Sequence, residues 1–103
     1  MRIQQIIGVL CAQNRLLAAI CAAPTVLAAY GVLDGRTATS HPSVRAEVGQ
    51  RAGRMSEVRV VVDGSVVTSQ SAGTAMEFAF KLVEILCGPA KAAEVNQGVL
   101  ARL

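Results

Sequence analysis

The chain has 103 residues, enough for one small domain, and a net charge of +3. Hydrophobic residues make up 52% of it and charged residues 17%, which is too apolar for disorder, and the 3% of aromatic residues argues against base-stacking platforms for nucleic acid. The three cysteines form no C-x-x-C pair, which argues against a disulfide framework or a zinc site. We therefore expect a reducing compartment: the cytoplasm, or alternatively an organelle, a plastid or the nucleus.

The N-terminal part of the chain alternates helix and strand signals. Residues 2–13 are predicted to form an amphipathic helix, with an apolar face made of Ile3, Ile6, Ile7 and Leu10. Asn14 suits a left-handed stop. The apolar run 15–20 then fits a short buried parallel strand, and Pro24 and Gly31 suit the first turn and the end of a second helix. This order predicts half of a doubly wound α/β layer.

The uncharged stretch from residue 16 to 33 has two other readings. It is just long enough for a membrane span, or it belongs to a signal peptide whose charged start is Met1-Arg2 and whose apolar part begins at residues 6–12. Pro24, Gly31 and the many alanines argue against a span, and Gln13, Asn14 and Arg15 interrupt the apolar run of a signal peptide. We therefore favour the strand and helix, and expect no membrane partner.

The middle of the chain reads as turns and short strands. Asp34-Gly35 predicts a turn before a short strand at 36–40, and residues 43–57 predict a short irregular helix and a loop. Asp63-Gly64, between two valine-rich runs, predicts a β-hairpin whose two turn residues both have positive φ.

The best helix signal follows this hairpin. Thr74 and Glu77 match a capping box, and Glu77 and Lys81 have the spacing of an i, i+4 ion pair. The apolar stripe of this helix consists of Met76, Ala79, Phe80, Val83, Leu86 and Cys87. Gly88-Pro89 is predicted to end it and to start a short helix at 90–96.

Cys21 stands where the predicted strand turns into the second helix. A single cysteine followed by two alanines and a helix-starting proline is the layout of a nucleophile elbow. The amides of the following helix point toward the sulfur and favour the reactive thiolate, and the backbone N–H of Ala22 is placed to stabilise an oxyanion. The alternative is a small buried apolar residue, which we also expect of Cys11 and Cys87.

His41 is the single histidine and lies in Ser40-His41-Pro42, where a strand is predicted to end. Active sites of α/β proteins gather at the carboxyl ends of strands, so His41 is a candidate to move protons near Cys21. A loop histidine that caps a turn is an equally good reading of the residues alone.

Four motifs in order resemble a known family: the A-I-C-A-x-P elbow at Cys21, T-x-H-P at His41, the D-G hairpin, and G-T-x-x-E-F at the start of the long helix. They are similar to the C-terminal part of the ThiJ/PfpI superfamily, in the branch of Parkinson disease protein 7 (protein deglycase). The resemblance covers the chain almost to Leu103 and makes residues 1–103 the C-terminal portion of a single domain of this type.

This resemblance implies an α/β, flavodoxin-like three-layer sandwich, similar to class I glutamine amidotransferases, that forms a homodimer. It implies glyoxalase or deglycase activity on methylglyoxal or glyoxal adducts without cofactor or metal. Cys21 would be the nucleophile, His41 the assisting residue and Ala22 the oxyanion donor. In a peptidase-like branch a histidine follows the nucleophile, and Ala22 at that place argues against proteolysis.

The chain departs from the family in two places. Gln70–Thr74 replaces an Arg/Lys-Gly-Pro-Gly-Thr loop. The family's first strands, with the acidic partner of the nucleophile, have no counterpart here, so we expect an incomplete sheet in a truncated form, a partial gene product or half of an assembly. Whether this chain is an enzyme therefore stays open. The alternative function, from another class, is a redox sensor or chaperone-like interaction protein with an oxidisable Cys21.

Overall fold

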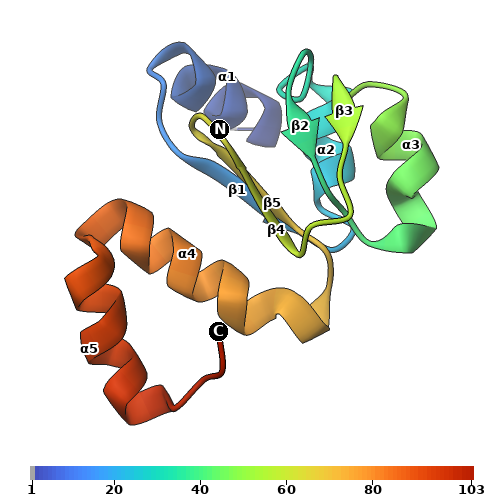
Figure 1. The fold of residues 1–103 in the computed structure, drawn as a ribbon. Helices are drawn as coiled ribbons and strands as arrows, with labels where there is room; N and C mark the ends of the chain where they lie inside the picture. The colour runs from blue at the N-terminus through green and yellow to red at the C-terminus, as the bar shows by residue number, and fades with distance from the viewer. Residues whose placement is uncertain (1) are drawn as a thin grey trace.

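The computed structural model of the protein describes residues 2–103. Its centre is a three-stranded sheet in the order β1 (Leu17–Ile20), β5 (Val66–Ser69), β4 (Val60–Asp63). The first pair is parallel and the second antiparallel (Figure 1). All four residues of β5 are buried, because this strand has a neighbour on each edge and helices on its faces. β1 and β4 are the two edges of the sheet.

The hairpin between β4 and β5 forms, but its turn is one residue later than predicted. Asp63 still belongs to β4 and pairs with Val66, so Gly64 and Ser65 make the two-residue turn. Gly64 has φ +60°, whereas Asp63 and Ser65 do not have positive φ. The turn therefore needs a glycine only at its first position, as in a type II′ turn.

Two helices flank β1, as the sequence predicted. α1 (Ile3–Ala12) ends before Asn14, whose φ of 53° is left-handed, and α2 (Pro24–Ala29) begins at the predicted proline. The main core lies between these helices, the sheet and the following loop. It consists of Ile7, Leu17, Ala19, Leu27, Ala28, Val32, Leu33, Ala38, Val48 and Val66. Burial of these aliphatic side chains is the main stabilising contribution to this half of the molecule.

A second, two-stranded sheet lies beside the first. It pairs β2 (Thr37–Ala38) with β3 (Arg54–Met55) in parallel; β2 is shorter than the predicted strand at 36–40, and β3 was expected to be loop. Between them lie a 3₁₀ turn, η1 (Pro42–Val44), and α3 (Arg45–Gly49). The pairing brings Gly53 so close to Gly35 that a Cβ on Gly53 would lie 2.6 Å from the carbonyl carbon of Gly35.

The C-terminal part is a helical hairpin. A 3₁₀ turn, η2 (Ala72–Thr74), leads into α4 (Ala75–Cys87), and α5 (Pro89–Val99) follows and is longer than the predicted 90–96. α4 lies on the opposite side of the sheet from α1 and α2, and α5 packs against α4 away from the sheet (Figure 1). Of α4, only Phe80 is fully buried, and Met76 and Leu86 of the predicted stripe are exposed.

The predicted side-chain pairs at the start of α4 are wrong. Thr74 makes no side-chain cap to α4, because its hydroxyl bonds to Ser69 and Ser71 instead. Glu77 pairs with Arg59, at 2.8 and 3.0 Å from Nε, and Lys81 pairs with Glu84. The guanidinium group of Arg59 contacts both carboxylate oxygens of Glu77. The single ammonium group of a lysine one helical turn away does not offer this planar arrangement of donors.

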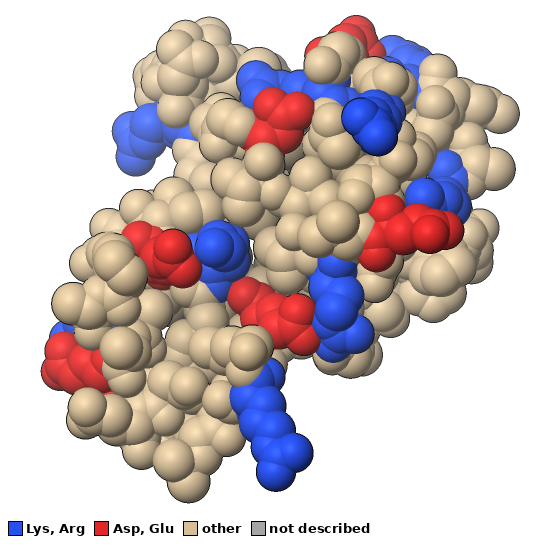
Figure 2. All heavy atoms as spheres, in the orientation of Figure 1, with Lys and Arg blue, Asp and Glu red and all other residues tan. Residues whose placement is uncertain are grey.

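The surface mixes charges of both signs. On the face shown in Figure 2, the side chains of Lys and Arg lie among those of Asp and Glu, with much uncharged surface between them. No helix within residues 2–103 has both the length and the hydropathy to cross a bilayer. The uncharged stretch that raised this possibility is divided between β1, a turn and α2.

Candidate functional site at the end of β1

Cys21 directly follows β1 and has a left-handed backbone, with φ 67°. A non-glycine residue in this conformation costs about 1 to 3 kcal/mol, so the surrounding structure must hold it there. The small side chains of Ala22 and Ala23 fit the tight turn that follows, and Pro24 starts α2. The sequence therefore brings the chain from strand to helix within three residues, with Cys21 at the bend.

Three backbone hydrogen bonds hold this bend. Cys21 N–H donates to the carbonyl of Ser69 at 3.1 Å, which continues the ladder between β1 and β5. Ala23 N–H donates to the carbonyl of Ile20 at 3.1 Å and closes the turn. His41 N–H donates to the carbonyl of Cys21 at 2.8 Å. Both peptide groups of Cys21 are thus fixed from different parts of the chain.

The sulfur of Cys21 is half-buried and lies 4.0 Å from the hydroxyl oxygen of Ser71. Ser71 is itself held in place, because its N–H donates to Thr74 Oγ1 at 3.1 Å. Thr74 Oγ1 lies 2.6 Å from Ser69 Oγ, and Ser69 also bonds to Cys21 through its carbonyl. The replaced loop at 70–74 therefore contributes a hydroxyl beside the thiol, which our sequence analysis did not propose as a site residue.

The N–H of Ala22, the predicted oxyanion donor, has no acceptor within residues 2–103. The N–H groups of Ala23, Thr25 and Val26 are all used by carbonyls three residues earlier. α2 has six residues, so its aligned peptides add less positive potential at the sulfur than a long helix would. The single free amide next to the sulfur is therefore the clearest donor for an anion there.

The backbone of His41 contacts Cys21, whereas its imidazole ring bonds to Ser43 in the following turn, η1. Ser43 N–H donates to His41 Nδ1 at 3.0 Å, and Ser43 Oγ lies 2.8 Å from the same nitrogen. His41 thus caps η1, as one of the two sequence readings expected. Because Nδ1 accepts from Ser43, a proton on the neutral ring belongs on Nε2.

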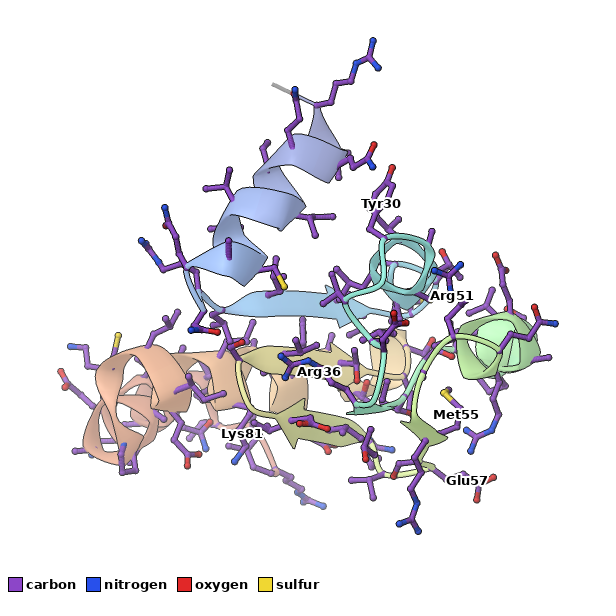
Figure 3. The ribbon with its side chains drawn as sticks, turned by 90° about the horizontal axis from the view of Figure 1, so that it is seen from above. Tyr30, Arg36, Arg51, Met55, Glu57 and Lys81 are labelled. Atoms are coloured by element: carbon purple, nitrogen blue, oxygen red, sulfur yellow. The ribbon has the colours of Figure 1, made fainter. Side chains whose placement is uncertain are left out.

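The segment that leads to His41 is attached to the sheet by two side chains. Asp63 Oδ2 accepts from the N–H of Thr37 at 2.7 Å, and Thr68 Oγ1 accepts from the buried N–H of Thr39 at 3.0 Å. Arg36 extends toward the sheet, as Figure 3 shows, and donates to the carbonyl of Asp63 at 2.9 Å. These bonds fix the segment that leads to His41 against the central sheet. They therefore determine where His41 lies relative to Cys21 at the end of β1.

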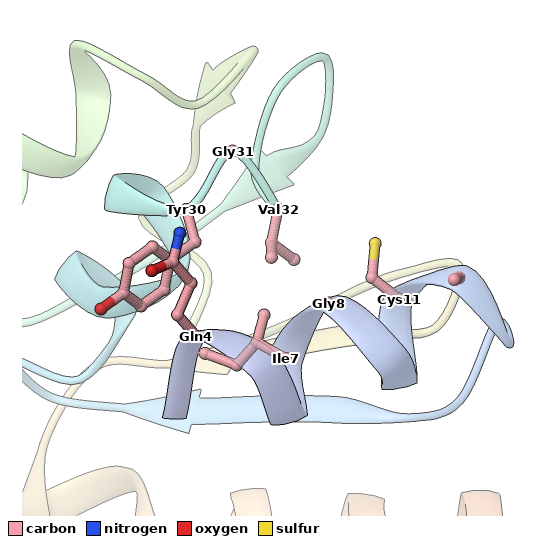
Figure 4. A pocket seen from close by; sticks show the side chains of 8 residues that line it. Gln4, Ile7, Gly8, Cys11, Tyr30, Gly31 and Val32 are labelled. Atoms are coloured by element: carbon pink, nitrogen blue, oxygen red, sulfur yellow. The ribbon is translucent and has the colours of Figure 1, made fainter. Parts of the chain in front are cut away.

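The other two cysteines were expected to be buried and are exposed. Cys11 lies at the C-terminal end of α1, which has only Ile7 fully buried, and Cys87 ends α4. Cys11, but not Cys21, is among the residues that line a cavity of about 480 Å³ (Figure 4). It lies between α1 and the loop after α2, and its lining is Gln4, Ile7, Gly8, Cys11, Ala12, Tyr30, Gly31 and Val32.

Within residues 2–103, no three side chains of His, Cys, Asp or Glu lie close enough together to hold a metal ion. The polar groups that meet at the bend are a thiol, a hydroxyl and backbone amides. Such a set of groups suits the attack of the thiol on an uncharged carbonyl compound. The hydrogen-bond donors of the site are already in place when the negative charge develops on the carbonyl oxygen.

Comparison with known proteins agrees with this description. A family model described as the DJ-1/PfpI family matches residues 1–85. Protein dj-1beta of Drosophila melanogaster is 47% identical over 85 residues, which is 82% of this chain and 46% of that protein. Glutathione-independent glyoxalase DJR-1.2 of Caenorhabditis elegans is 43% identical over 76 residues, which is 74% of this chain and 40% of that protein.

The solved structures extend the match to nearly the whole chain. The crystal structure of Drosophila melanogaster DJ-1beta superposes with a TM-score of 0.93 and 40% identity, over 98% of this chain and 54% of that one. This similarity shows the flavodoxin-like α/β fold, of which the chain has a partial sheet. The chain spans about half the length of these relatives and matches their C-terminal part. It belongs to the DJ-1/PfpI family.

Proposed function

We propose that this chain carries the nucleophile of a cofactor-independent glyoxalase that acts on methylglyoxal or on glyoxal adducts of proteins. The observation that carries the proposal is the left-handed Cys21 at the end of β1, held by three backbone hydrogen bonds beside the unpaired N–H of Ala22. A relative with 43% identity is named a glutathione-independent glyoxalase, which supports the same reaction class here.

The chemistry needs only groups at this bend and water. The thiolate of Cys21 adds to the aldehyde carbon of methylglyoxal, a C–S bond forms, and the carbonyl oxygen takes up a proton to give a hemithioacetal. A proton then moves from that carbon to the neighbouring carbon, and the hydroxyl proton of the hemithioacetal moves to the ketone oxygen, so that the first carbon is oxidised to a thioester and the ketone is reduced to an alcohol. Water cleaves the thioester to lactate and frees the thiol, so the reaction balances without an external oxidant or reductant.

Two other groups have roles in these steps. The N–H of Ala22 donates to the oxyanion that forms when the thiolate adds. His41 carries the proton between the two carbons, through Nε2, because Nδ1 is engaged by Ser43. The hydrogen bond from His41 N–H to the carbonyl of Cys21 keeps the two residues together during this transfer.

The test is lactate formation from methylglyoxal by the purified chain. Cys21→Ser is expected to abolish it, since a serine hydroxyl stays protonated at neutral pH and is a far weaker nucleophile than a thiolate, while Cys11→Ser, which changes an exposed cysteine, should leave it unchanged. Equal lactate production by the Cys21→Ser variant would refute the proposal.

A second function, oxidation sensing, is supported by the contact between the Cys21 sulfur and Ser71 Oγ. Peroxide converts a thiolate to a sulfenate and then, with a second peroxide, to a sulfinate, and each step releases water or hydroxide. Ser71 O–H and Ala22 N–H are hydrogen-bond donors available to the sulfinate oxygens. The chain would then act by its oxidation state and not by turnover.

Intact-mass measurement with peptide mapping after mild peroxide treatment separates the two functions. Addition of two oxygens at Cys21 before Cys11 or Cys87, in a chain that produces no lactate, would support sensing. Lactate production by the unoxidised chain and its loss with Cys21 oxidation would support the glyoxalase.

A further inference from the structure

The chain just before β4 holds the loop that follows β5. The ladder between these two strands ends at Ser69, but side chains continue the contact beyond it. Ser69 Oγ donates to the carbonyl of Arg59 at 2.8 Å, and Gln70 Nε2 donates to the carbonyl of Glu57 at 2.9 Å. The position of the loop at 70–74 therefore depends on the segment that leads into β4.

The side chain of Arg59 makes a further attachment, on the outside of this loop. Its Nη2 donates to the carbonyl of Gly73 at 2.8 Å, and the same nitrogen lies 2.7 Å from Glu77 Oε1. Nε donates to both carboxylate oxygens of Glu77, in the first turn of α4. Because the planar guanidinium is fixed by this carboxylate, its remaining N–H group points at the carbonyl of Gly73.

Ser71 lies in the same loop, ahead of both of its attachments to the rest of the chain. The inner attachment is buried, because Thr74 Oγ1 lies 2.6 Å from Ser69 Oγ, whereas Gly73 is exposed at the surface. The hydroxyl oxygen of Ser71 is 4.0 Å from the sulfur of Cys21, which is long for a hydrogen bond. A small displacement of the loop therefore ends this contact.

We propose that Arg59 and Glu77 are positioning residues for Cys21: by holding the loop at Gly73, they keep the hydroxyl of Ser71 beside the sulfur and so raise the reactivity of the thiol. Within residues 2–103 neither side chain makes a hydrogen bond or an ion pair with Cys21, so both act through Ser71. This serine belongs to the loop in which the chain departs from the family pattern. The inference rests on the role proposed above for Cys21, and it adds the residues that control that site from a distance.

Glu77→Ala tests this role through the alkylation of Cys21 by iodoacetamide at neutral pH. Without its carboxylate partner, the side chain of Arg59, which is 55% exposed, is free to turn into solvent, and its bond to Gly73 weakens. We expect the alkylation rate of Cys21 to fall by about twofold. The loss should be smaller than for Ser71→Ala, because the buried attachment at Thr74 remains.

Glu84→Ala is the matched control, because it removes another ion pair of the same helix. Glu84 pairs with Lys81 at 3.4 Å, away from the loop, so this variant should leave the Cys21 rate unchanged. Cys87 is exposed at the end of α4, and its own alkylation rate, measured by peptide mass spectrometry, shows whether the helix has changed. Glu77→Gln keeps an oxygen that accepts from Arg59, so its Cys21 rate should lie closer to that of the original chain.

A double variant separates positioning through Ser71 from general loosening of the site. If Glu77 acts through the hydroxyl of Ser71, then Glu77→Ala has no further effect on the Cys21 rate in a chain that already carries Ser71→Ala. A general loss of structure would instead slow Cys21 in both backgrounds by the same factor. Circular dichroism of each variant checks that it still folds.

Three results would overturn the proposal: an unchanged Cys21 rate in Glu77→Ala, an equal slowing in the Ser71→Ala background, or a parallel change at Cys87. If Glu77→Ala does not fold, Arg59→Lys takes its place in the same comparisons, because one ammonium group cannot donate in the same plane to both Glu77 and Gly73. Alkylation requires no turnover. A chain that produces no lactate would therefore refute the glyoxalase and leave this test intact, and an unchanged alkylation rate would refute the positioning role alone.

Discussion

The backbone N–H of His41 donates to the carbonyl oxygen of Cys21 at 2.8 Å. This bond joins two residues that are 20 positions apart in the sequence and that follow strands of different sheets, β1 and β2. It depends on the position of β2 relative to the central sheet. Two hydrogen bonds fix that position, from Thr37 N–H to Asp63 and from Thr39 N–H to Thr68. The relation between Cys21 and His41 is therefore a property of sheet packing.

Thr68→Val is expected to loosen this relation. The substitution keeps the shape of the side chain but leaves the buried N–H of Thr39 without its acceptor, which costs about 1 to 3 kcal/mol of unfolding free energy. Urea unfolding measures the loss, and faster exchange of the His41 amide would show that the contact with Cys21 weakens as well. Thr25→Val, which removes a solvent-exposed hydrogen bond to the carbonyl of Ala22 and leaves no buried group without a partner, is the control and should cost only about 0.5 kcal/mol.

The left-handed backbone of Cys21 predicts an unusual order of stability. Glycine normally destabilises a protein relative to alanine, but at φ 67° alanine keeps the strain that glycine relieves. Cys21→Gly should therefore be more stable than Cys21→Ala by about 1 kcal/mol in urea unfolding. If the alanine variant is the more stable one, the bend at Cys21 does not have this conformation in solution.

Ser71→Ala removes the hydroxyl that contacts the sulfur. Since a hydrogen-bond donor stabilises a thiolate, we expect Cys21 to react with iodoacetamide about threefold more slowly at neutral pH in this variant. Peptide mass spectrometry follows each cysteine separately, so that Cys11 reports on the general reactivity of the sample. Ser65→Ala, in the hairpin turn, provides a serine control, and an unchanged Cys21 rate in Ser71→Ala would remove Ser71 from the site.

The Arg59–Glu77 pair predicts a pH dependence of stability. The hydrogen bond from Arg59 holds the pKa of Glu77 below its ordinary value of 4.5. A carboxyl group with a lowered folded-state pKa stabilises the fold above its unfolded pKa, and this contribution disappears as the pH falls through the lowered value.

The difference in unfolding free energy between the original chain and Glu77→Gln should therefore be constant at neutral pH and shrink below about pH 4.5. Arg59 is exposed and Glu77 is half-buried at the surface, so the difference should be small and should decrease with added salt. Urea titrations of both proteins across this range measure it. Parallel pH profiles for the two proteins would contradict a specific Arg59–Glu77 contribution.

Local signals in the sequence predicted most of the elements. The apolar runs of β1 and β5, the proline at the start of α2 and the left-handed Asn14 each depend on neighbours within a few residues, so they could be identified before the structure. β3 could not, because residues 54–55 become a strand only by pairing with β2. The turn position at Gly64 was missed by one residue, since Asp63 is held in β4 by its bonds to Arg36 and Thr37.

The sequence by itself determined that Cys21 stands at a strand-to-helix bend, because a short apolar run ends before it and Pro24, with its fixed φ, suits the first turn of a helix three residues later. The tertiary structure alone decided what surrounds the sulfur. The hydroxyl of Ser71 and the backbone of His41 arrive from loops 50 and 20 residues away, and Glu77 leaves its helical neighbours for Arg59. Such contacts depend on how the sheets and helices pack, and the residue pattern along the chain carries no local sign of them.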